Sequence, residues 1–179
     1  MSLTRKLPLI AGALSLSFAL PGAATLVAHE YTANTVTVSH PWARATPPGA
    51  TVGAAYLEIA ASKKGDDKLI GGRSEIAGRL EIHTHERDGD VMKMKQVAAL
   101  PVKAGKSVVL KPAGDHVMLM DLKRPLVEGD LLKLTLTFEK AGDVEIEATV
   151  EPVGAKGPHG MDHQPGHEAD HSGHGAHKH

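Results

Sequence analysis

Residues 132–138 read Leu-Lys-Leu-Thr-Leu-Thr-Phe, an alternation of apolar and polar side chains with a period of two. Successive side chains of a strand point to opposite faces of a sheet, so this period indicates a β-strand with one buried face. Six further segments alternate in the same way or are short apolar runs: 35–38, 55–59, 80–82, 108–110, 117–120 and 144–147. The chain shows no helical period of convincing length, so we predict an all-β protein.

Turn-forming residues separate these segments at intervals of about ten residues. The turn signals are Pro47-Pro48-Gly49, Gly65-Asp66-Asp67, Asp88-Gly89, Ala113-Gly114-Asp115, Glu128-Gly129-Asp130 and Ala141-Gly142-Asp143. Seven to nine short strands joined by tight turns are typical of an antiparallel sandwich or barrel.

The composition excludes several classes of function. The 179 residues include 20 Lys and Arg against 21 Asp and Glu, and this balance argues against a nucleic-acid binder, which would carry a basic excess. The chain has no cysteine, so disulfides, thiolate zinc sites, cysteine nucleophiles and thiolate blue-copper centres are excluded. It does have 12 His and 6 Met, which are possible metal ligands.

The first 28 residues are typical of a secretory signal peptide. A short positive region precedes an apolar stretch over residues 7–20, which is short for a membrane span, and cleavage after Ala24 or Ala28 is acceptable. We therefore expect export to the periplasm and a mature domain over residues 29–153. A membrane anchor is the alternative.

The far end of the chain, residues 154–179, differs from the rest in composition. It has no aromatic or branched aliphatic side chain and cannot bury enough apolar surface to fold, so we predict a disordered tail. Its possible metal ligands are His159, Met161, His163, His167, His171, His174, His177 and His179. Such imidazoles suit Cu(II) capture, and a solvated tail with incidental metal affinity is the alternative.

The residues that carry chemistry begin with one hairpin. If Asp88-Gly89 is a two-residue loop, His85 faces Met92 and His83 faces Met94 across the two strands. Directly opposed side chains are close neighbours in a sheet, so two imidazoles and two thioethers share one face of this hairpin.

A later strand repeats this combination of ligands. His116, Met118 and Met120 share one face, while Val117 and Leu119 point to the other and are the natural inward residues. The His and Met side chains are therefore expected on the outer face or the rim. Thioethers discriminate against Zn, Mg and Ca, and with imidazoles they favour Cu(I), although ordinary packing is the alternative for any one of them.

The spacing of these ligands resembles a known family. His83, ten residues, Met94, twenty-one residues, His116, one residue and Met118 is similar to the ligand pattern of the periplasmic copper chaperones called PCu(A)C. Residues 40–49 and 116–126 are also similar, and the resemblance covers about residues 29–152. It implies a cupredoxin-like Greek-key barrel with these four residues as the primary Cu(I) ligands. The accessory candidates are His85, Met92 and Met120.

The resemblance also implies a function and partners. Members of this family deliver copper for the assembly of cytochrome c oxidase, notably its copper A site in subunit II, sometimes together with Sco-type proteins. We therefore expect a monomeric, non-enzymatic chaperone that does not bind nucleic acid. His85 stands where the family often has Met, and a third imidazole would raise the affinity for Cu(II).

Two other functions are compatible with the sequence. One is a periplasmic copper buffer for tolerance, without a dedicated client. The other is a redox copper enzyme in which the free amine and the imidazole of His29 chelate Cu(II), which requires cleavage after Ala28.

Overall fold

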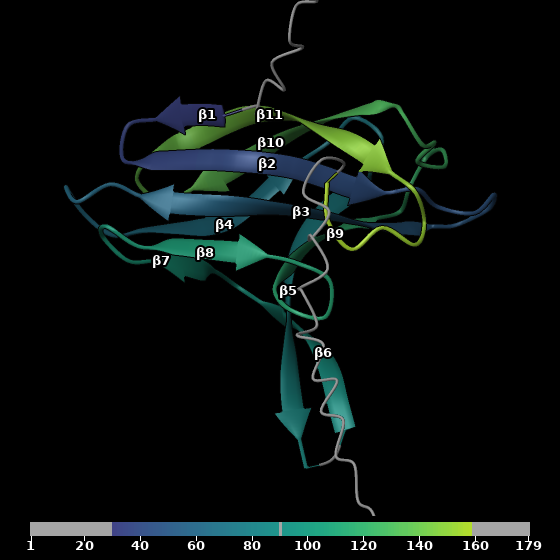
Figure 1. Cartoon of the computed structure of the whole chain (residues 1–179), viewed down its shortest axis with the longest axis horizontal. Helices are drawn as coiled ribbons and strands as arrows, with labels where there is room; N and C mark the ends of the chain where they lie inside the picture. Colours follow the sequence, from purple (N-terminus) through teal and green to yellow (C-terminus); the bar gives the residue numbers. More distant parts are fainter. Residues whose placement is uncertain (1–29, 90, 159–179) are drawn as a thin grey trace, which may run out of the picture.

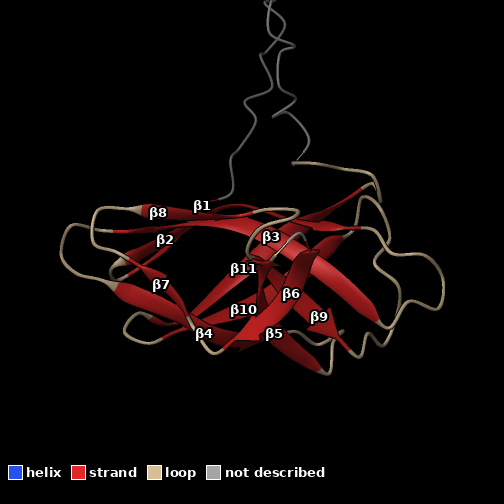
Figure 2. Cartoon of the chain, turned by 90° about the horizontal axis from the view of Figure 1, so that it is seen from below, coloured by secondary structure: helices blue, strands red, loops and turns tan. Residues whose placement is uncertain are grey.

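The computed structural model describes residues 30–89 and 91–158, and this part of the chain contains eleven strands (Figures 1 and 2). The strands are β1 (Glu30–Ala33), β2 (Val36–Arg44), β3 (Val52–Ala61), β4 (Asp67–Arg73), β5 (Arg79–Asp88), β6 (Val91–Val97), β7 (Leu100–Val102), β8 (Ser107–Leu110), β9 (His116–Met120), β10 (Leu131–Phe138) and β11 (Gly142–Glu151). No helix in these residues is long and apolar enough to span a membrane. The predicted signal segment, His29 and the tail residues from His159 to His179 lie outside the described residues.

The expected all-β fold is confirmed, with eleven strands in the described residues in place of seven to nine. The three strands that the sequence did not indicate are β1, β4 and β7. β1 and β7 have only four and three residues, which is too short to show a period. β4 contains Gly71 and Gly72, which interrupt its apolar pattern.

The strands follow the order β6-β5-β9-β3-β2-β11-β10-β4-β7, with β1 paired to β2 and β8 paired to β3. The expectation of purely antiparallel pairing is wrong at one place, because β11 pairs with β2 in parallel and sets Thr149 opposite Trp42. Parallel neighbours need a long connection, and here the connection is nearly the whole domain. The first and last long strands therefore lie side by side.

The core is built from the inward positions of the alternating strands. In β10 the even-numbered residues from Leu132 to Phe138 are buried, and Leu134 lies opposite Ile146 of β11. The other large buried side chains include Val36, Val38, Ile59, Leu69, Leu110, Leu119 and Leu126. Each fully buried aliphatic side chain contributes roughly 1.5–3 kcal/mol. The described core is therefore mainly aliphatic, as the sequence indicates.

A one-residue bulge in β2 decides which side chains reach the far face of the sheet. Ser39 lies opposite Glu58, but Trp42 lies opposite Tyr56, so one extra residue is inserted at His40-Pro41. His40 has φ 52°, a left-handed conformation that is costly for a side chain with a Cβ atom. Without the bulge Trp42 would point into the core, and with it Trp42 packs against Tyr56 on the outer face.

The strain at His40 gives a testable expectation. Glycine adopts the left-handed region freely, so His40→Gly should raise the free energy of unfolding by about 0.5–1 kcal/mol, despite the greater entropy of glycine in the unfolded chain. Ser39→Gly in the same strand has no such strain to relieve and should lower the free energy of unfolding by about 0.5–1 kcal/mol. Urea denaturation of both variants measures the two signs. A loss of stability in both would mean that the His40 side chain contributes more than its backbone costs.

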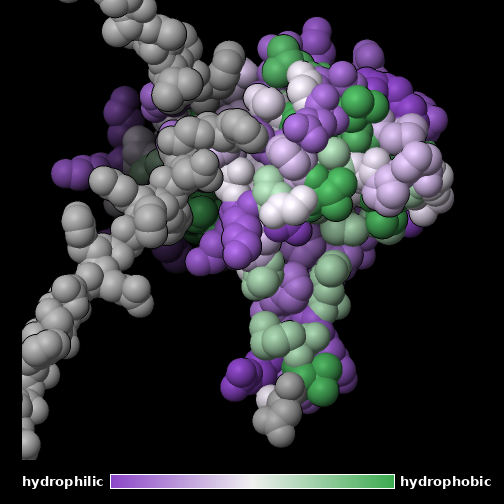
Figure 3. Space-filling view, turned by 45° about the vertical axis from the view of Figure 1, so that its right-hand side comes forward, coloured by the Kyte–Doolittle hydropathy of each residue, from purple (hydrophilic) through white to green (hydrophobic). Residues whose placement is uncertain are grey.

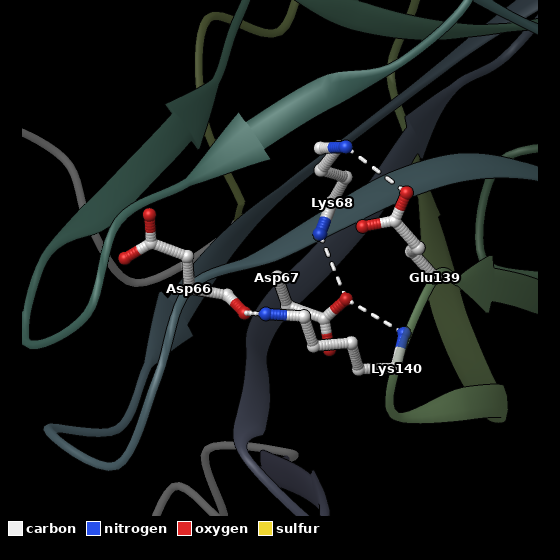
Figure 4. Close-up of polar contacts among 5 residues, drawn as sticks. All are labelled: Asp66, Asp67, Lys68, Glu139 and Lys140. Carbon is white, nitrogen blue, oxygen red and sulfur yellow. Dashed lines mark hydrogen bonds and ion pairs between the residues drawn. The ribbon is translucent and has the colours of Figure 1, made fainter.

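A buried carboxylate fixes the end of the barrel where β4 begins (Figure 4). Asp67 is 1% exposed, and its Oδ1 accepts hydrogen bonds from the backbone N–H groups of Lys68 (2.8 Å) and Lys140 (3.0 Å). Its Oδ2 accepts from the backbone N–H of Ala141 (2.9 Å) and the hydroxyl of Thr35 (3.3 Å). Asp67 was expected in a turn, but as the first residue of β4 it joins that strand to the β10–β11 turn.

Candidate metal centre

The predicted ligands lie on three adjacent strands, β6, β5 and β9. Beyond His83, β5 no longer pairs with β9 and continues only with β6. Residues 84–89 and 91–95 thus form a two-stranded arm that projects from the barrel, with hydrophobic side chains along it (Figures 1 and 3). The candidate site lies at the root of this arm.

His83 occupies the centre of the candidate site. It lies directly opposite His116 across β5 and β9, and the two ring centroids are 5.8 Å apart. Met94 of β6 and Met118 of β9 each lie one diagonal step from His83, within reach of long side chains. The four predicted primary ligands therefore fall on neighbouring positions of one face.

The predicted register of the hairpin is wrong by one pairing step. Asp88 pairs with Val91 in the strands, so it is not part of the loop as predicted, and His85 faces Met94. Gly89 has φ 61° and takes the first loop position, where positive φ suits glycine. Each residue of β5 therefore faces a residue of β6 two positions later than predicted. Because side chains alternate with a period of two, every side chain keeps its predicted face.

His116 lies on the expected outer face, opposite His83 and away from the inward Val117, but it is only 4% exposed because other side chains cover it. β9 lies between β5 and β3, and Tyr56 of β3 packs beside His116 with a ring separation of 6.4 Å. The ring of Trp42 packs in turn against that of Tyr56, with the centroids 4.4 Å apart and the planes tilted by 34°. Burial lowers the pKa of His116 more than its hydrogen bond to Gly114 raises it, so this imidazole is neutral at pH 7 and able to bind a metal.

One carbonyl group sets the tautomer of two imidazoles. The carbonyl oxygen of Gly114 lies 2.8 Å from Nδ1 of His116 and 3.1 Å from Nδ1 of His85. A carbonyl only accepts hydrogen bonds, so both Nδ1 atoms carry the hydrogen and the lone pair of each neutral ring is on Nε2. The two rings are 5.4 Å apart, so His85 borders the predicted primary site.

His83 has the opposite arrangement. Its Nε2 lies 2.8 Å from a carboxylate oxygen of Glu81, which fixes the hydrogen on Nε2. Its Nδ1 is buried and has no hydrogen-bond partner among the described residues. Buried polar atoms without partners are rare and call for an explanation, and a bound cation is one. The residues present therefore fit a metal that accepts an imidazole nitrogen here.

The thioethers complete the candidate site from two sides. Met118 is half-buried beside Ala54 and Glu81, whereas Met94 is 52% exposed on the arm. Of the accessory candidates, Met92 lies opposite Arg87 toward the arm's tip and Met120 opposite Arg79. In residues 30–89 and 91–158 no three His, Cys, Asp or Glu side chains form a preformed metal cluster. The candidate ligands at this face are the imidazoles together with the soft sulfur atoms.

Three supporting groups were not predicted from the sequence. Glu81 could have been found, because it stands two residues before His83 in a strand and so shares its face. The Gly114 carbonyl could not, because backbone hydrogen-bond partners outside regular structure leave no side-chain pattern. Tyr56 was assigned only to a mostly buried strand, and its position beside His116 follows from the pairing of β3 with β9.

Comparison with known proteins identifies relatives of the whole domain. The sequence model of the family described as "Putative lipoprotein LpqE-like" matches residues 36–150. The "Putative lipoprotein Lxx21020" of Leifsonia xyli subsp. xyli is 30% identical over 120 residues, which cover 66% of this chain and 71% of that protein.

Solved structures with the same architecture include two copper-bound forms, and they confirm the predicted cupredoxin-like fold. The copper-bound PCuAC domain from PmoF2 is 31% identical, with a TM-score of 0.61, and the match covers 69% of this chain and 98% of that one. The solution structure of Cu(I)-DR1885 from Deinococcus radiodurans is 30% identical, with a TM-score of 0.54, and the match covers 72% and 83% of the two chains.

Proposed function

The chain belongs to the LpqE-like family and has the fold of PCuAC copper-chaperone domains, and from this premise we propose that it is a copper carrier. It binds one Cu(I) through His83, Met94, His116 and Met118 and passes it to a client protein. The observation that carries this proposal is the buried, unpartnered Nδ1 of His83 beside the neutral imidazole of His116.

The ligand chemistry favours monovalent copper. Two neutral imidazoles and two neutral thioethers add no negative charge, which suits a soft monovalent cation better than a hard divalent one. The site has a buried half, with His116, and an exposed half, with Met94. This asymmetry supports transfer, because an incoming ligand can displace the exposed thioether while the buried imidazoles still hold the ion.

The client that the family resemblance favours is cytochrome c oxidase subunit II, with or without a Sco-type protein. The test mixes the Cu(I)-loaded chain with the apo copper A domain of subunit II, separates the two proteins and measures the copper in each. Movement of most of the copper to subunit II supports the proposal. Retention by the chain with Cu(I) bound would favour the buffer for copper tolerance instead.

The names of the relatives support an exported protein. Both the matching family and the Leifsonia relative are described as lipoproteins, which are proteins of the cell envelope. We place the mature chain in the periplasm, where a thioether site is suited to an oxidising compartment because it cannot be disabled by disulfide formation.

The histidine-rich tail is proposed to capture Cu(II). Deleting residues 159–179 should leave Cu(I) binding intact but remove most of the Cu(II) capacity, because the tail holds seven of the 12 His. The deletion starts after Pro158, since Arg44 donates two hydrogen bonds to the carbonyl of Ala155 (2.6 and 2.8 Å) and holds that segment on the barrel.

Calorimetric Cu(II) titration of both chains at about pH 7.5 and about pH 5.5 tests the role of the tail. Imidazole must lose its proton to bind a metal, so the capacity due to the tail should fall as the pH drops through about 6.5. Equal Cu(II) stoichiometry of the two chains at the higher pH would show that the tail is not a metal site.

A further inference from the structure

Glu81 makes the one hydrogen bond that the structure gives the ring of His83. The two residues are alternate positions of β5 and share a face, and Oε2 of Glu81 accepts from Nε2 of His83 at 2.8 Å. Both side chains are largely buried. A hydrogen bond to a carboxylate in such surroundings is strong and directional, so it fixes both the orientation and the tautomer of the ring.

The carboxylate of Glu81 is itself held in place. Its Oε1 accepts a hydrogen bond from Nε of Arg79 at 2.9 Å, and Nη1 of Arg79 lies 3.6 Å from Oδ2 of Asp121. Each oxygen of Glu81 therefore has its own donor, one from the exposed Arg79 and one from the candidate ligand. This division prevents the carboxylate from turning away without breaking a second interaction.

We propose that Glu81 is a positioning residue of the copper site, whose hydrogen bond to Nε2 of His83 makes the buried Nδ1 the atom that binds copper. This inference rests on the proposed function, because it takes His83 as a ligand. It also assigns opposite nitrogens to the two imidazoles. Gly114 occupies Nδ1 of His116 and leaves Nε2 to bind, while Glu81 occupies Nε2 of His83 and leaves Nδ1.

His83 and His116 bind through different ring nitrogens because different groups accept their hydrogen bonds. The group that fixes His116 is a backbone carbonyl two residues before it, and the group that fixes His83 is a side chain two residues before it. A backbone support cannot be removed by substitution, whereas Glu81 can be replaced. The affinity of the site for Cu(I) should therefore depend on this one carboxylate although it does not touch the metal.

Two-bond proton–nitrogen correlation NMR of the ¹⁵N-labelled full chain tests the assignment directly. It distinguishes protonated from lone-pair ring nitrogens, and Cu(I), with a filled d shell, does not broaden the signals. The His83 signals are identified by their loss in His83→Asn. We expect apo His83 to be protonated on Nε2, and one equivalent of Cu(I) to shift Nδ1 while Nε2 keeps its hydrogen.

Two substitutions measure the contribution of Glu81. Glu81→Leu removes the acceptor, and we expect the Cu(I) dissociation constant, measured by competition with a chromophoric chelator, to rise about 10- to 100-fold while His83 populates both tautomers. Glu81→Gln keeps an acceptor oxygen and should preserve the tautomer, with a rise of at most about tenfold. Glu86→Gln is the matched control, because Glu86 is exposed on the same strand and bonds Lys95.

The outcomes separate this inference from the proposed function. If Cu(I) shifts the NMR signal of Nε2 of His83 and not that of Nδ1, the positioning role is wrong but the proposed copper site stands. If Cu(I) shifts neither nitrogen of His83, the proposed copper site itself is wrong. If Glu81→Leu fails to fold, Glu81→Gln and the wild-type spectra still decide. An unchanged tautomer and affinity in a folded Glu81→Leu protein would overturn the inference.

Discussion

Replacing Asp67 by alanine is expected to lower the free energy of unfolding by about 3–4 kcal/mol, a large loss for one side chain. The substitution leaves three backbone N–H groups, those of Lys68, Lys140 and Ala141, without their acceptor in a buried region. Each unsatisfied buried donor costs about 1–3 kcal/mol, and partial access of water to the vacated space keeps the total below the sum.

Asp66→Ala is the control for this substitution. Asp66 is the preceding carboxylate and also accepts two hydrogen bonds, from Lys103 and from the N–H of Ala104, but it lies at the surface. Its loss should cost less than about 1 kcal/mol, because water replaces an exposed acceptor. Chemical denaturation of both variants at neutral pH measures the difference. Equal losses would show that the buried hydrogen bonds of Asp67 contribute no more than exposed ones.

The contribution of Asp67 should depend on pH in a defined direction. Burial by itself would raise the pKa of Asp67, but the hydrogen bonds to Lys140, Lys68 and Ala141 outweigh it and hold the pKa below its usual value. A lowered pKa in the folded state means that the stabilisation is complete above about pH 4 and is lost as the pH falls through the folded-state pKa. Asp67→Asn should therefore lose less stability than the wild type between pH 7 and acid.

The sequence correctly predicted which side chains share the face of the candidate site, because the face of a strand residue depends only on whether its position is odd or even. His83 and Met94 fell on one side of the hairpin despite the wrong register, since a two-residue shift restores the alternation. Their partners could not be predicted so well, because the pairing depends on which two residues occupy the loop. The β-rich pattern was similarly robust, and only short or glycine-containing strands were missed.

Two other features have no signal in the local pattern. The bulge at His40 inserts one residue and reverses the alternation of β2. The alternating sequence pattern does not indicate where such an insertion occurs. The parallel pairing of β11 with β2 joins segments more than 100 residues apart. The bulge affects the site, because it turns Trp42 outward against Tyr56, which in turn packs beside His116. The burial of His116 was thus not predictable from its strand alone.

Replacing His116 by asparagine is expected to raise the dissociation constant for Cu(I) by more than about 100-fold. The Nδ2–H of asparagine can donate to the Gly114 carbonyl as Nδ1 of His116 does, so the fold should be preserved while the Nε2 ligand is lost. Anaerobic competition titration of Cu(I) on the chain truncated after Pro158 measures the affinity without the tail. Circular dichroism checks that the β-structure remains.

The two methionines of the arm give this experiment a matched comparison. Met92 and Met94 lie on the same strand and face and are both 52% exposed, but only Met94 lies opposite His85, next to the site. Met94→Leu should raise the dissociation constant for Cu(I) at least tenfold and weaken the copper–sulfur scattering in X-ray absorption. Met118→Leu should have the same two effects. Met92→Leu should change neither the affinity nor the scattering. Because leucine preserves the size and apolarity of the side chain, the difference reports the sulfur atom alone. A copper shell of nitrogen only in the unsubstituted truncated chain would show that the thioethers are not ligands and that the imidazoles bind copper without them.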